Sequence, residues 1–454
     1  MQIPIMAGTS AKGGRFNASF PINLEPRAVE NGLSQGQLVS SRGAVDVVTG
    51  PGKDRGGIAW NGTLYRVMGG KLVSVSSAGV ITALGDVADD TRPCKFDYGF
   101  GRLGIRSADR LYYWDGATLA EVTDPDLGSV VDFVWMDGYY VTTDGTYVVV
   151  TELRDPTAVD PIKYGSAEED PDAVTGVEKW REELYVFGRH TIQVFQNVGG
   201  LTFPFQVNQG AMVPYGCISA TAKTRIADTI AFVGGGRDEP LRVYALQNGT
   251  AAAISTEEID RLLAAEPYPE LIELEQRGFG SETVLYVHLS QVTAAITLRT
   301  SGEANQPAWF YLNSGRFGPY RPVHAVLCYG KHWVGDLSSS RLGVLSDDVT
   351  SHFGEEADWQ FDTAAMFNDG ASFIVHGVEL FGQFPTGPNA VFLSMTRDGA
   401  QWSNEVSRVL TGRRDERVNW RPHVRIPAWC GLRWRGSGKV AIARAEIDAE
   451  PLAA

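Results

Sequence analysis

Few stretches of this chain have the residue types and spacing that catalysis or cofactor binding requires. GFGRLG at 99–104 matches the glycine spacing of a dinucleotide-binding turn, but that turn must follow a strand and open an amphipathic helix. The residues after it, IRSADRLYYWDG, read as a strand and a turn, so we interpret these glycines as part of a hairpin. GSGKV at 436–440 has Val440 where a phosphate-binding loop needs Ser or Thr.

The ionisable side chains do not show the spacing of a metal or catalytic centre either. The seven histidines lack His-x-His and His-Glu-x-x-His spacings, and the four cysteines lie more than 100 residues apart. Glu182 and Glu183 would point to opposite faces of a strand, so they cannot act on one bond. The sequence therefore predicts no catalytic residue, no metal site and no cofactor, and it predicts buried free thiols in a reducing compartment.

One turn has the features of a carbohydrate-active propeller. MTRDGAQW at 395–402 approximates the Asp-containing turn of sialidase-type propellers, in which the Asp caps a hairpin and the Trp packs beneath it. That role is structural, and one copy supplies neither the arginine cluster nor the Tyr nucleophile of a sialidase site.

The elements that carry these residues are almost all strands. Asn-Gly and Asp-Gly dipeptides, which accept the positive φ of tight hairpin turns, interrupt alternating apolar runs such as NGTLYRVMGGKLVSV at 61–75. A four-stranded sheet cannot bury both faces alone, whereas radial stacking of such sheets does. We therefore predict an all-β fold with a β-propeller of six or seven blades, and two stacked sandwiches are the competing arrangement. The repeated units fall near residues 58–85, 98–122, 131–152, 177–196, 226–254, 283–299 and 325–347.

Composition divides the chain into three parts. Residues 1–48 are rich in Pro, Asn and Gly and predict an extended N-terminal arm, residues 49–352 predict the propeller, and residues 353–454 predict a C-terminal β-sandwich. STEEIDRLLAAE at 255–266 predicts one helix inserted between blades. No apolar run reaches the roughly 20 residues of a membrane span, and the N-terminus lacks the apolar core of a signal peptide.

Charge is unevenly distributed along the chain. The formal net charge of −14 argues against a general affinity for nucleic acid. Residues 408–444 nevertheless carry ten Lys and Arg against Asp415 and Glu416, a formal +8, which leaves −22 on the remainder. Two interpretations remain open: solvated strand faces with local ion pairs, or a positive patch that meets an acidic partner or an acidic face of another copy of this chain.

Six stretches of the chain, taken in order, resemble a known family. They are LYRVMGGKLVSV, LGSVVDFVWMDGYYVTTDGTYVVVTEL, GVEKWREELYVFGRHTIQVFQNVGG, VPYGCISATAKTRIADTIAFVG, AISTEEIDRLL and VFLSMTRDGAQWS. In this order, and over most of residues 60–450, they resemble the packaged-DNA stabilisation proteins of short-tailed bacteriophages, which are also called tail accessory or head-completion proteins.

The resemblance implies a structural virion protein that is not an enzyme. Such proteins form a ring, typically a homohexamer, below the portal and its adaptor ring protein. The ring extends the DNA exit channel, retains packaged DNA and offers attachment sites to tail spikes or fibres and to a plug or needle. The resemblance also implies synthesis in the host cytoplasm and incorporation into the virion tail.

The resemblance gives the uneven charge a role. An acidic wall repels phosphate, so double-stranded DNA would pass without sequence-specific binding, and the basic 408–444 stretch would face another protein. Arg and Trp are enriched at interface hot spots. The alternatives are a carbohydrate-binding or glycan-cleaving propeller for host recognition and a bacterial propeller that serves as a protein-binding platform. The predicted protein-interface residues are Arg413, Arg414, Arg417, Trp420 and Arg421.

Overall fold

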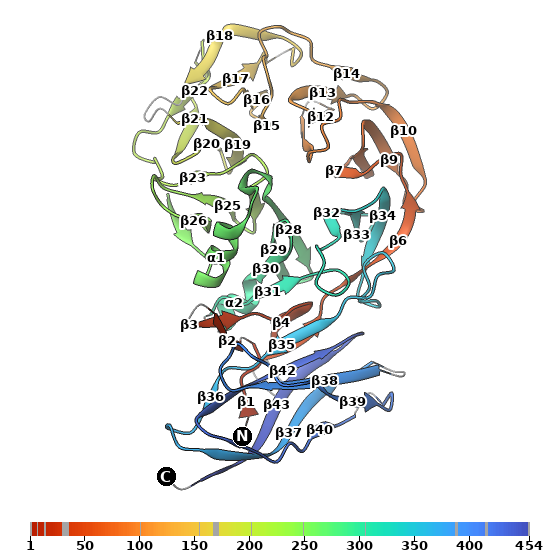
Figure 1. Ribbon diagram of the computed structural model, residues 1–454. Helices are drawn as coiled ribbons and strands as arrows, with labels where there is room; N and C mark the ends of the chain where they lie inside the picture. Colours follow the sequence, from red (N-terminus) through yellow and green to blue (C-terminus); the bar gives the residue numbers. More distant parts are fainter. Residues whose placement is uncertain are drawn as a thin grey trace.

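Seven antiparallel sheets stand side by side in a ring, and a two-sheet sandwich lies against one side of that ring (Figure 1). This count and the description below refer to the part of the chain that the computed structural model describes. The arrangement confirms the predicted all-β fold, a β-propeller followed by a β-sandwich, and the seven blades fall within the predicted six or seven. The described residues are 2–6, 8–12, 15–29, 36–99, 101–153, 155–166, 172–200, 202–247, 249–304, 306–385, 389–413 and 416–452.

The first six blades are built from strands that follow one another in the chain. The strands of the first three are β7 (Asp54–Trp60), β8 (Thr63–Met68), β9 (Lys71–Val75), β10 (Ile81–Asp86), β11 (Lys95–Gly99), β12 (Arg102–Ser107), β13 (Arg110–Trp114), β14 (Leu119–Glu121), β15 (Asp132–Met136), β16 (Tyr139–Thr143), β17 (Tyr147–Thr151) and β18 (Val159–Ser166). Those of the next three are β19 (Val174–Trp180), β20 (Glu183–Gly188), β21 (Ile192–Asn197), β22 (Phe205–Val207), β23 (Gly216–Cys217), β24 (Lys223–Ile226), β25 (Thr229–Gly235), β26 (Arg242–Gln247), β27 (Thr250–Ala253), β28 (Glu273–Phe279), β29 (Glu282–His288), β30 (Thr293–Thr297) and β31 (Trp309–Leu312).

Tight turns with positive φ connect many of these strands. Asn61 and Gly62 join β7 to β8 with φ of 49° and 76°, and Asp137 and Gly138 join β15 to β16 with φ of 49° and 96°. A left-handed backbone at both positions is what a two-residue type I′ hairpin turn requires. The GFGRLG stretch falls in the same context, because it connects the antiparallel strands β11 and β12.

Helices are short and lie between blades or strands. α1 (Glu257–Ala265) and the 3-10 turn η1 (Pro269–Leu271) connect the fifth blade to the sixth, where the sequence predicted a helix, and α2 (Leu298–Ala304) connects β30 to β31. The apolar side of α1 packs on the propeller through the buried residues Ile259 and Leu263.

A strand from the N-terminal segment completes the seventh blade. This blade contains β32 (Pro322–Cys328), β33 (Lys331–Asp336) and β34 (Arg341–Ser346), and its fourth strand is β6 (Gly43–Thr49), which pairs with β34. Residues 43–48, expected in the arm, therefore supply the outermost strand of the last blade. The sequence held little local signal for this pairing, because the partner strand lies at the far end of the propeller segment.

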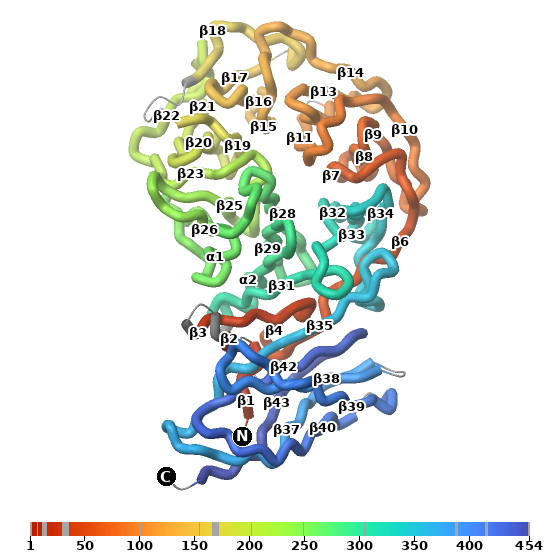
Figure 2. Tube along the Cα trace, in the orientation of Figure 1, coloured from red at the N-terminus to blue at the C-terminus, as the bar shows by residue number. Residues whose placement is uncertain are grey.

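The rest of the N-terminal segment packs on the same chain. β1 (Gln2–Ile3) and β5 (Gly36–Ser40) pair with β43 (Ala441–Pro451), β4 (Leu24–Ala28) pairs with β5, and β2 (Gly8–Lys12) forms a hairpin with β3 (Arg15–Ser19). Ile22 forms bridges to Tyr311 of the propeller and to Gln360 of the sandwich. Figure 2 shows this red segment lying between the two domains. Its few apolar residues carry the packing, since Ile3, Leu24 and Leu38 belong to the sandwich core.

The sandwich has two antiparallel sheets with an aromatic and aliphatic core between them. Trp359, Phe361 and Trp434 lie in that core, and Phe361 stacks on Trp434 with ring centroids 5.1 Å apart. One sheet has the order β4-β5-β43-β37-β40 with β1 and β41 attached, and the other has the order β35-β42-β38-β39 with β36 attached. The remaining bounds are β35 (Trp359–Asp362), β36 (Met366–Phe367), β37 (Phe373–Gln383), β38 (Asn389–Thr396), β39 (Val406–Leu410), β40 (Val418–Trp420), β41 (Val424–Ile426) and β42 (Trp429–Gly436).

Buried ion pairs connect the innermost strands of different blades. Lys95 of β11 lies 2.9 Å from Glu178 of β19, and Lys223 of β24 pairs with Asp132 of β15. Burial alone would raise the pKa of Glu178, but Lys95 and Arg225 outweigh burial and lower that pKa to about 2. Glu178 therefore stays ionised, and the cations Lys95 and Lys223 hold blades together that are not neighbours in the ring.

His324 joins the three blades at the closure of the ring. Its Nδ1 lies 2.8 Å from Asp54 Oδ2 of the first blade, and its Nε2 lies 3.2 Å from Glu273 Oε2 of the sixth. Both neighbours are acceptors, so both ring nitrogens carry protons and the side chain is an imidazolium. Burial would lower the pKa of His324, but Glu273 and Asp54 outweigh it and raise this pKa to about 10.

We predict that His324→Gln lowers the free energy of unfolding at pH 7 by roughly 2–3 kcal/mol, because it leaves the half-buried Glu273 without its cation and leaves buried Asp54 with Arg66 alone. A folded-state pKa of about 10, above the ordinary 6.5, means that the stabilisation is complete below pH 6.5 and is lost as pH rises through 10. Urea unfolding of both proteins at pH 7 and pH 10.5 should therefore show a difference that shrinks at the higher pH. A difference independent of pH would contradict the charged histidine. His376→Gln is the control, since its partner Glu450 is exposed.

We predict that Gly43→Val opens the seventh blade. A Cβ at Gly43 would lie 2.5 Å from Ser351 O and 2.7 Å from Val349 O, so the added side chain forces β6 away from its neighbours. The thermal midpoint should fall by several degrees, and limited proteolysis should cut the N-terminal segment sooner. Val45→Thr, at an exposed position on the same strand, should leave both measurements unchanged. Equal behaviour of the two variants would show that β6 does not hold the ring closed.

Candidate interaction surface of the sandwich

The basic segment of the chain forms the side of the sandwich where the edges of its two sheets meet, at β39 and β40. Trp420 Nε1 donates to Val406 O at 2.9 Å, and Arg408 Nε donates to Asn419 O at 2.8 Å. Trp420 is only 2% exposed, so its indole supports this edge from inside the core. Val406 and Val409 are 56% and 74% exposed. The edge strand β39 thus presents apolar side chains to solvent.

The structure places the predicted interface arginines in different settings. Arg413 and Arg421 are exposed, and neither makes an ion pair with a carboxylate of the described residues. Arg417 is exposed, but its guanidinium binds Glu379 of β37 through two hydrogen bonds, one of 2.6 Å. Arg414 lies outside the described residues. Arg413 and Arg421 are therefore the predicted residues with the most available charge.

Three further arginines extend this positive surface. Arg397 donates to the backbone carbonyl of Arg425, Arg408 to that of Asn419, and Arg425 to Ser372 Oγ. These acceptors are neutral, so they orient the guanidinium groups without offsetting the charge. We call the set formed by Arg397, Arg408, Arg413, Arg421 and Arg425 the basic surface.

Other arginines of the same segment are neutralised by ion pairs. Arg433 binds Asp362 through two hydrogen bonds of 2.7 and 2.8 Å, and Arg435 binds Glu405 and Asp358. Local ion pairs, the first interpretation, therefore describe this part of the segment. The other part keeps its positive charge, and its contact with an acidic partner or with another copy stays a prediction.

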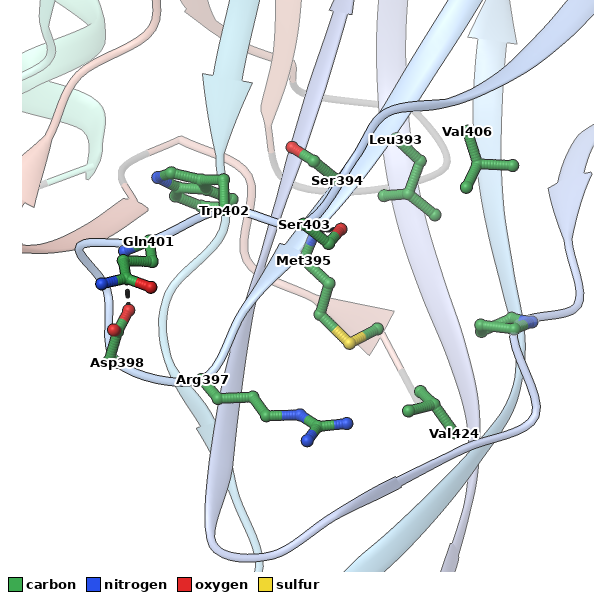
Figure 3. A pocket seen from close by; sticks show the side chains of 11 residues that line it. Leu393, Ser394, Met395, Arg397, Asp398, Gln401, Trp402, Ser403, Val406 and Val424 are labelled. Carbon is green, nitrogen blue, oxygen red and sulfur yellow. Dashed lines mark hydrogen bonds between the residues drawn. The ribbon is translucent and has the colours of Figure 1, made fainter.

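A cleft of about 500 Å³ opens between the sheets beside this edge (Figure 3). The Met395 side chain reaches into it, with Val406 and Val424 on one side and Arg397 below. An apolar floor with a cationic rim suits an apolar side chain carried by an acidic segment. The lining residues are Leu393, Ser394, Met395, Arg397, Asp398, Gln401, Trp402, Ser403, Val406, Pro422 and Val424.

Asp398 shapes one wall of the cleft. Its Oδ1 accepts hydrogen bonds from the backbone N–H groups of Gln401 at 2.7 Å and Ala400 at 2.9 Å, and these bonds hold the pKa of Asp398 below its ordinary value. Trp402 lies against the guanidinium of Arg433, with the ring centroid 3.9 Å from Cζ. The aspartate therefore caps the hairpin, as the sequence predicted. Its carboxylate is engaged by the turn.

Reactive groups elsewhere are dispersed or inert. Within the described ranges no three His, Cys, Asp or Glu side chains come together as metal ligands, and no helix is long and apolar enough to cross a membrane. Burial raises the pKa of Cys217 and of Cys94 to about 11, so these thiols stay protonated at neutral pH.

Sequence reasoning missed the cleft, Arg397 and the two exposed valines. The arginines were chosen from the charge of the segment alone, and the residues on neighbouring strands that would pair with them were not identified. The alternation of apolar Val418 and Trp420 around polar Asn419 was the signal in the sequence that Trp420 faces the core.

Comparisons with known proteins cover both domains. The family model described as "Bacteriophage P22 Gp10, beta-propeller" matches residues 1–350, and the one described as "Bacteriophage P22 Gp10, beta-sandwich" matches residues 358–450. The tail hub protein gp10 of Salmonella phage P22 is 27% identical over 466 aligned residues, which cover 96% of each chain.

Similar solved structures include the N-terminal domain of Nup159, with a TM-score of 0.43, 10% identity, and coverage of 72% of this chain and 98% of that one. PorZ of Porphyromonas gingivalis has a TM-score of 0.41 and 10% identity, and covers 83% of this chain and 46% of its own. Those scores are too low to support a functional comparison. The two family matches together span nearly the whole chain, and they show that it belongs to the Gp10 family of bacteriophage P22.

Proposed function

We propose that this chain is a structural protein of a bacteriophage tail and forms part of the tail hub. The observation that carries the proposal is the match to the P22 tail hub protein, which extends over 96% of both chains and through both domains. The protein acts by assembly and carries out no catalytic turnover. It is made in the host cytoplasm and becomes part of the virion.

The copies form a closed ring, a homohexamer, below the portal and its adaptor ring protein. This ring extends the DNA exit channel, retains packaged DNA and offers attachment sites to tail spikes or fibres and to a plug or needle. Buried ion pairs between the innermost strands, such as Lys95 with Glu178, support a passage enclosed by the copies together and not one through each propeller. The net charge of −14 supports passage of DNA without sequence-specific binding.

The basic surface is a contact between proteins in this assembly. Its support is the exposure of Arg413 and Arg421, and the position of Arg421 next to Pro422 of the apolar cleft, a combination typical of interface hot spots. Arg417 contributes through Glu379, which it holds in place across β37 and β40. Trp420 contributes from the core, because it fixes the edge strand that carries Val406.

Imaging of the purified chain with and without the adaptor ring of its own phage tests the proposal. We expect closed rings with an axial opening wide enough for duplex DNA, at least when the adaptor is present. Particles that lack the chain should lose their DNA. A chain that remains monomeric with the adaptor, and whose deletion leaves tails complete, would contradict the proposal.

We predict that Arg413→Glu/Arg421→Glu lowers incorporation of the chain into particles by about tenfold, because reversed charges at a desolvated contact repel the partner. Quantitative immunoblots of purified particles measure this against the major capsid protein. Lys53→Glu/Arg92→Glu is the matched control, since it makes the same charge change at exposed positions of the propeller. Equal incorporation of both variants would show that the basic surface makes no contact in the assembly.

A further inference from the structure

The charges of this protein are separated along its long axis. Residues 115–172 contain 14 Asp and Glu against Arg154 and Lys163, a formal −12 out of the total of −14. The described part of this segment forms β14 and the third blade, β15–β18, at the end of the propeller farthest from the sandwich (Figure 1). We call the described residues of 115–166 the acidic pole. The basic surface lies at the opposite end of the molecule.

The charge of the acidic pole remains uncompensated because its aspartates cap turns. Asp115 accepts from the backbone N–H groups of Ala117 and Thr118, and Asp144 accepts from those of Thr146 and Tyr147. A backbone N–H satisfies the oxygen but brings no positive charge. Cations neutralise three carboxylates of this segment in the described residues, through the pairs Glu121–Arg110, Glu152–Lys163 and Asp132–Lys223.

Apolar side chains lie exposed among these carboxylates. Ile162, on the outermost strand β18, is 69% exposed, and Tyr147 and Leu153 are nearly half exposed. Asp155 and Asp160 lie close by in sequence and cap the turns that lead into β18 and through it. The acidic pole therefore combines exposed apolar groups with negative charge.

The basic surface has the complementary combination. Its cleft has an apolar floor that includes Met395 and Val424, and the adjacent strand exposes Val406 and Val409. Arg397 lines the cleft, Arg421 precedes its lining residue Pro422, and Arg408 lies between the two valines. Apolar contact supplies affinity when it is buried, and opposite charges around it select the partner and its orientation. Both surfaces thus expose apolar side chains, and their charges are opposite in sign.

We infer that the acidic pole of one copy docks on the basic surface of the next copy, with Ile162 or a neighbouring apolar side chain at the cleft. The inference rests on the proposed function, in which the copies form a closed ring. Contact between two basic surfaces, or between two acidic poles, would bring like charges together. A contact between two different patches is heterologous, and its repetition forms a ring when the rotation from copy to copy closes on itself, as the proposed function requires.

Charge exchange between the two surfaces tests the inference in assembled particles. The sandwich variant is Arg413→Glu/Arg421→Glu, and the propeller variant is Leu153→Arg/Ile162→Arg, at positions exposed enough to accept a long side chain. Each double variant should lower incorporation by about tenfold. The quadruple variant should return incorporation to within about twofold of the unaltered chain, because the new arginines of one copy attract the new glutamates of the next. Leu153→Ser/Ile162→Ser separates loss of apolar contact from charge repulsion.

Cross-linking identifies the copies that meet. Chains with Ile162→Cys and chains with Val406→Cys, at an exposed residue that lines the cleft, are co-expressed and treated, in particles, with a short bismaleimide. A cross-linked dimer should appear in the mixture and not with either variant alone, because the link joins an acidic pole to a basic surface. Thermal unfolding of each purified chain establishes that the substitutions leave the fold intact.

The outcomes separate this inference from the proposed function. Rescue by the quadruple variant together with the mixed cross-link supports the inference. Closed rings seen by imaging, without rescue and without the mixed cross-link, would overturn it and leave the tail-hub function standing, with a different tail protein on the basic surface. Absence of rings from the unaltered chain with its adaptor would overturn both.

Discussion

Closure of the ring of blades is the constraint on which the rest of the structure depends. A blade buries its faces only against its neighbours, so the seventh blade must be complete and must meet the first. β6 supplies the missing strand, and His324 binds carboxylates of the first and sixth blades from β32. The segment that ends in β6 also forms β4 and β5 beside the sandwich. Ring closure and attachment of the second domain therefore share one piece of chain.

Carboxylates have opposite electrostatic consequences in the two places where this chain uses them. Asp54 and Asp132 are buried on innermost strands, where each faces a cation, because an unpaired charge there would be costly. Asp115 and Asp144 lie at hairpin turns in contact with water, where a backbone N–H is sufficient. The centre of the propeller is therefore close to neutral, and net negative charge collects at the hairpins of the second and third blades.

Local patterns predicted more of this fold than long-range ones. Asn61-Gly62 and Asp137-Gly138 identify hairpins within a few residues, and repeated hairpins imply blades. The pairing of β6 with β34 and of β1 with β43 joins segments near opposite ends of their domains, so no local pattern indicates it. The contacts of the predicted interface residues likewise depend on strand pairing that no local pattern indicates. Composition identified the arginines, but only the pairing of β37 with β40, which sets Asn419 opposite Glu379, brings Arg417 within reach of that carboxylate.

The N-terminal strands are synthesised long before the strands with which they pair. β1, β5 and β6 are made before their partners β43 and β34, and most of the described chain separates them from these partners. Until then these strands have unpaired edges, which are prone to association with other chains. The ring can close only after β34 has been made, and the sandwich can be completed only after β43 has been made. A chain that terminates before β43 therefore lacks a complete sandwich. Such a chain cannot present the surfaces that assembly would require.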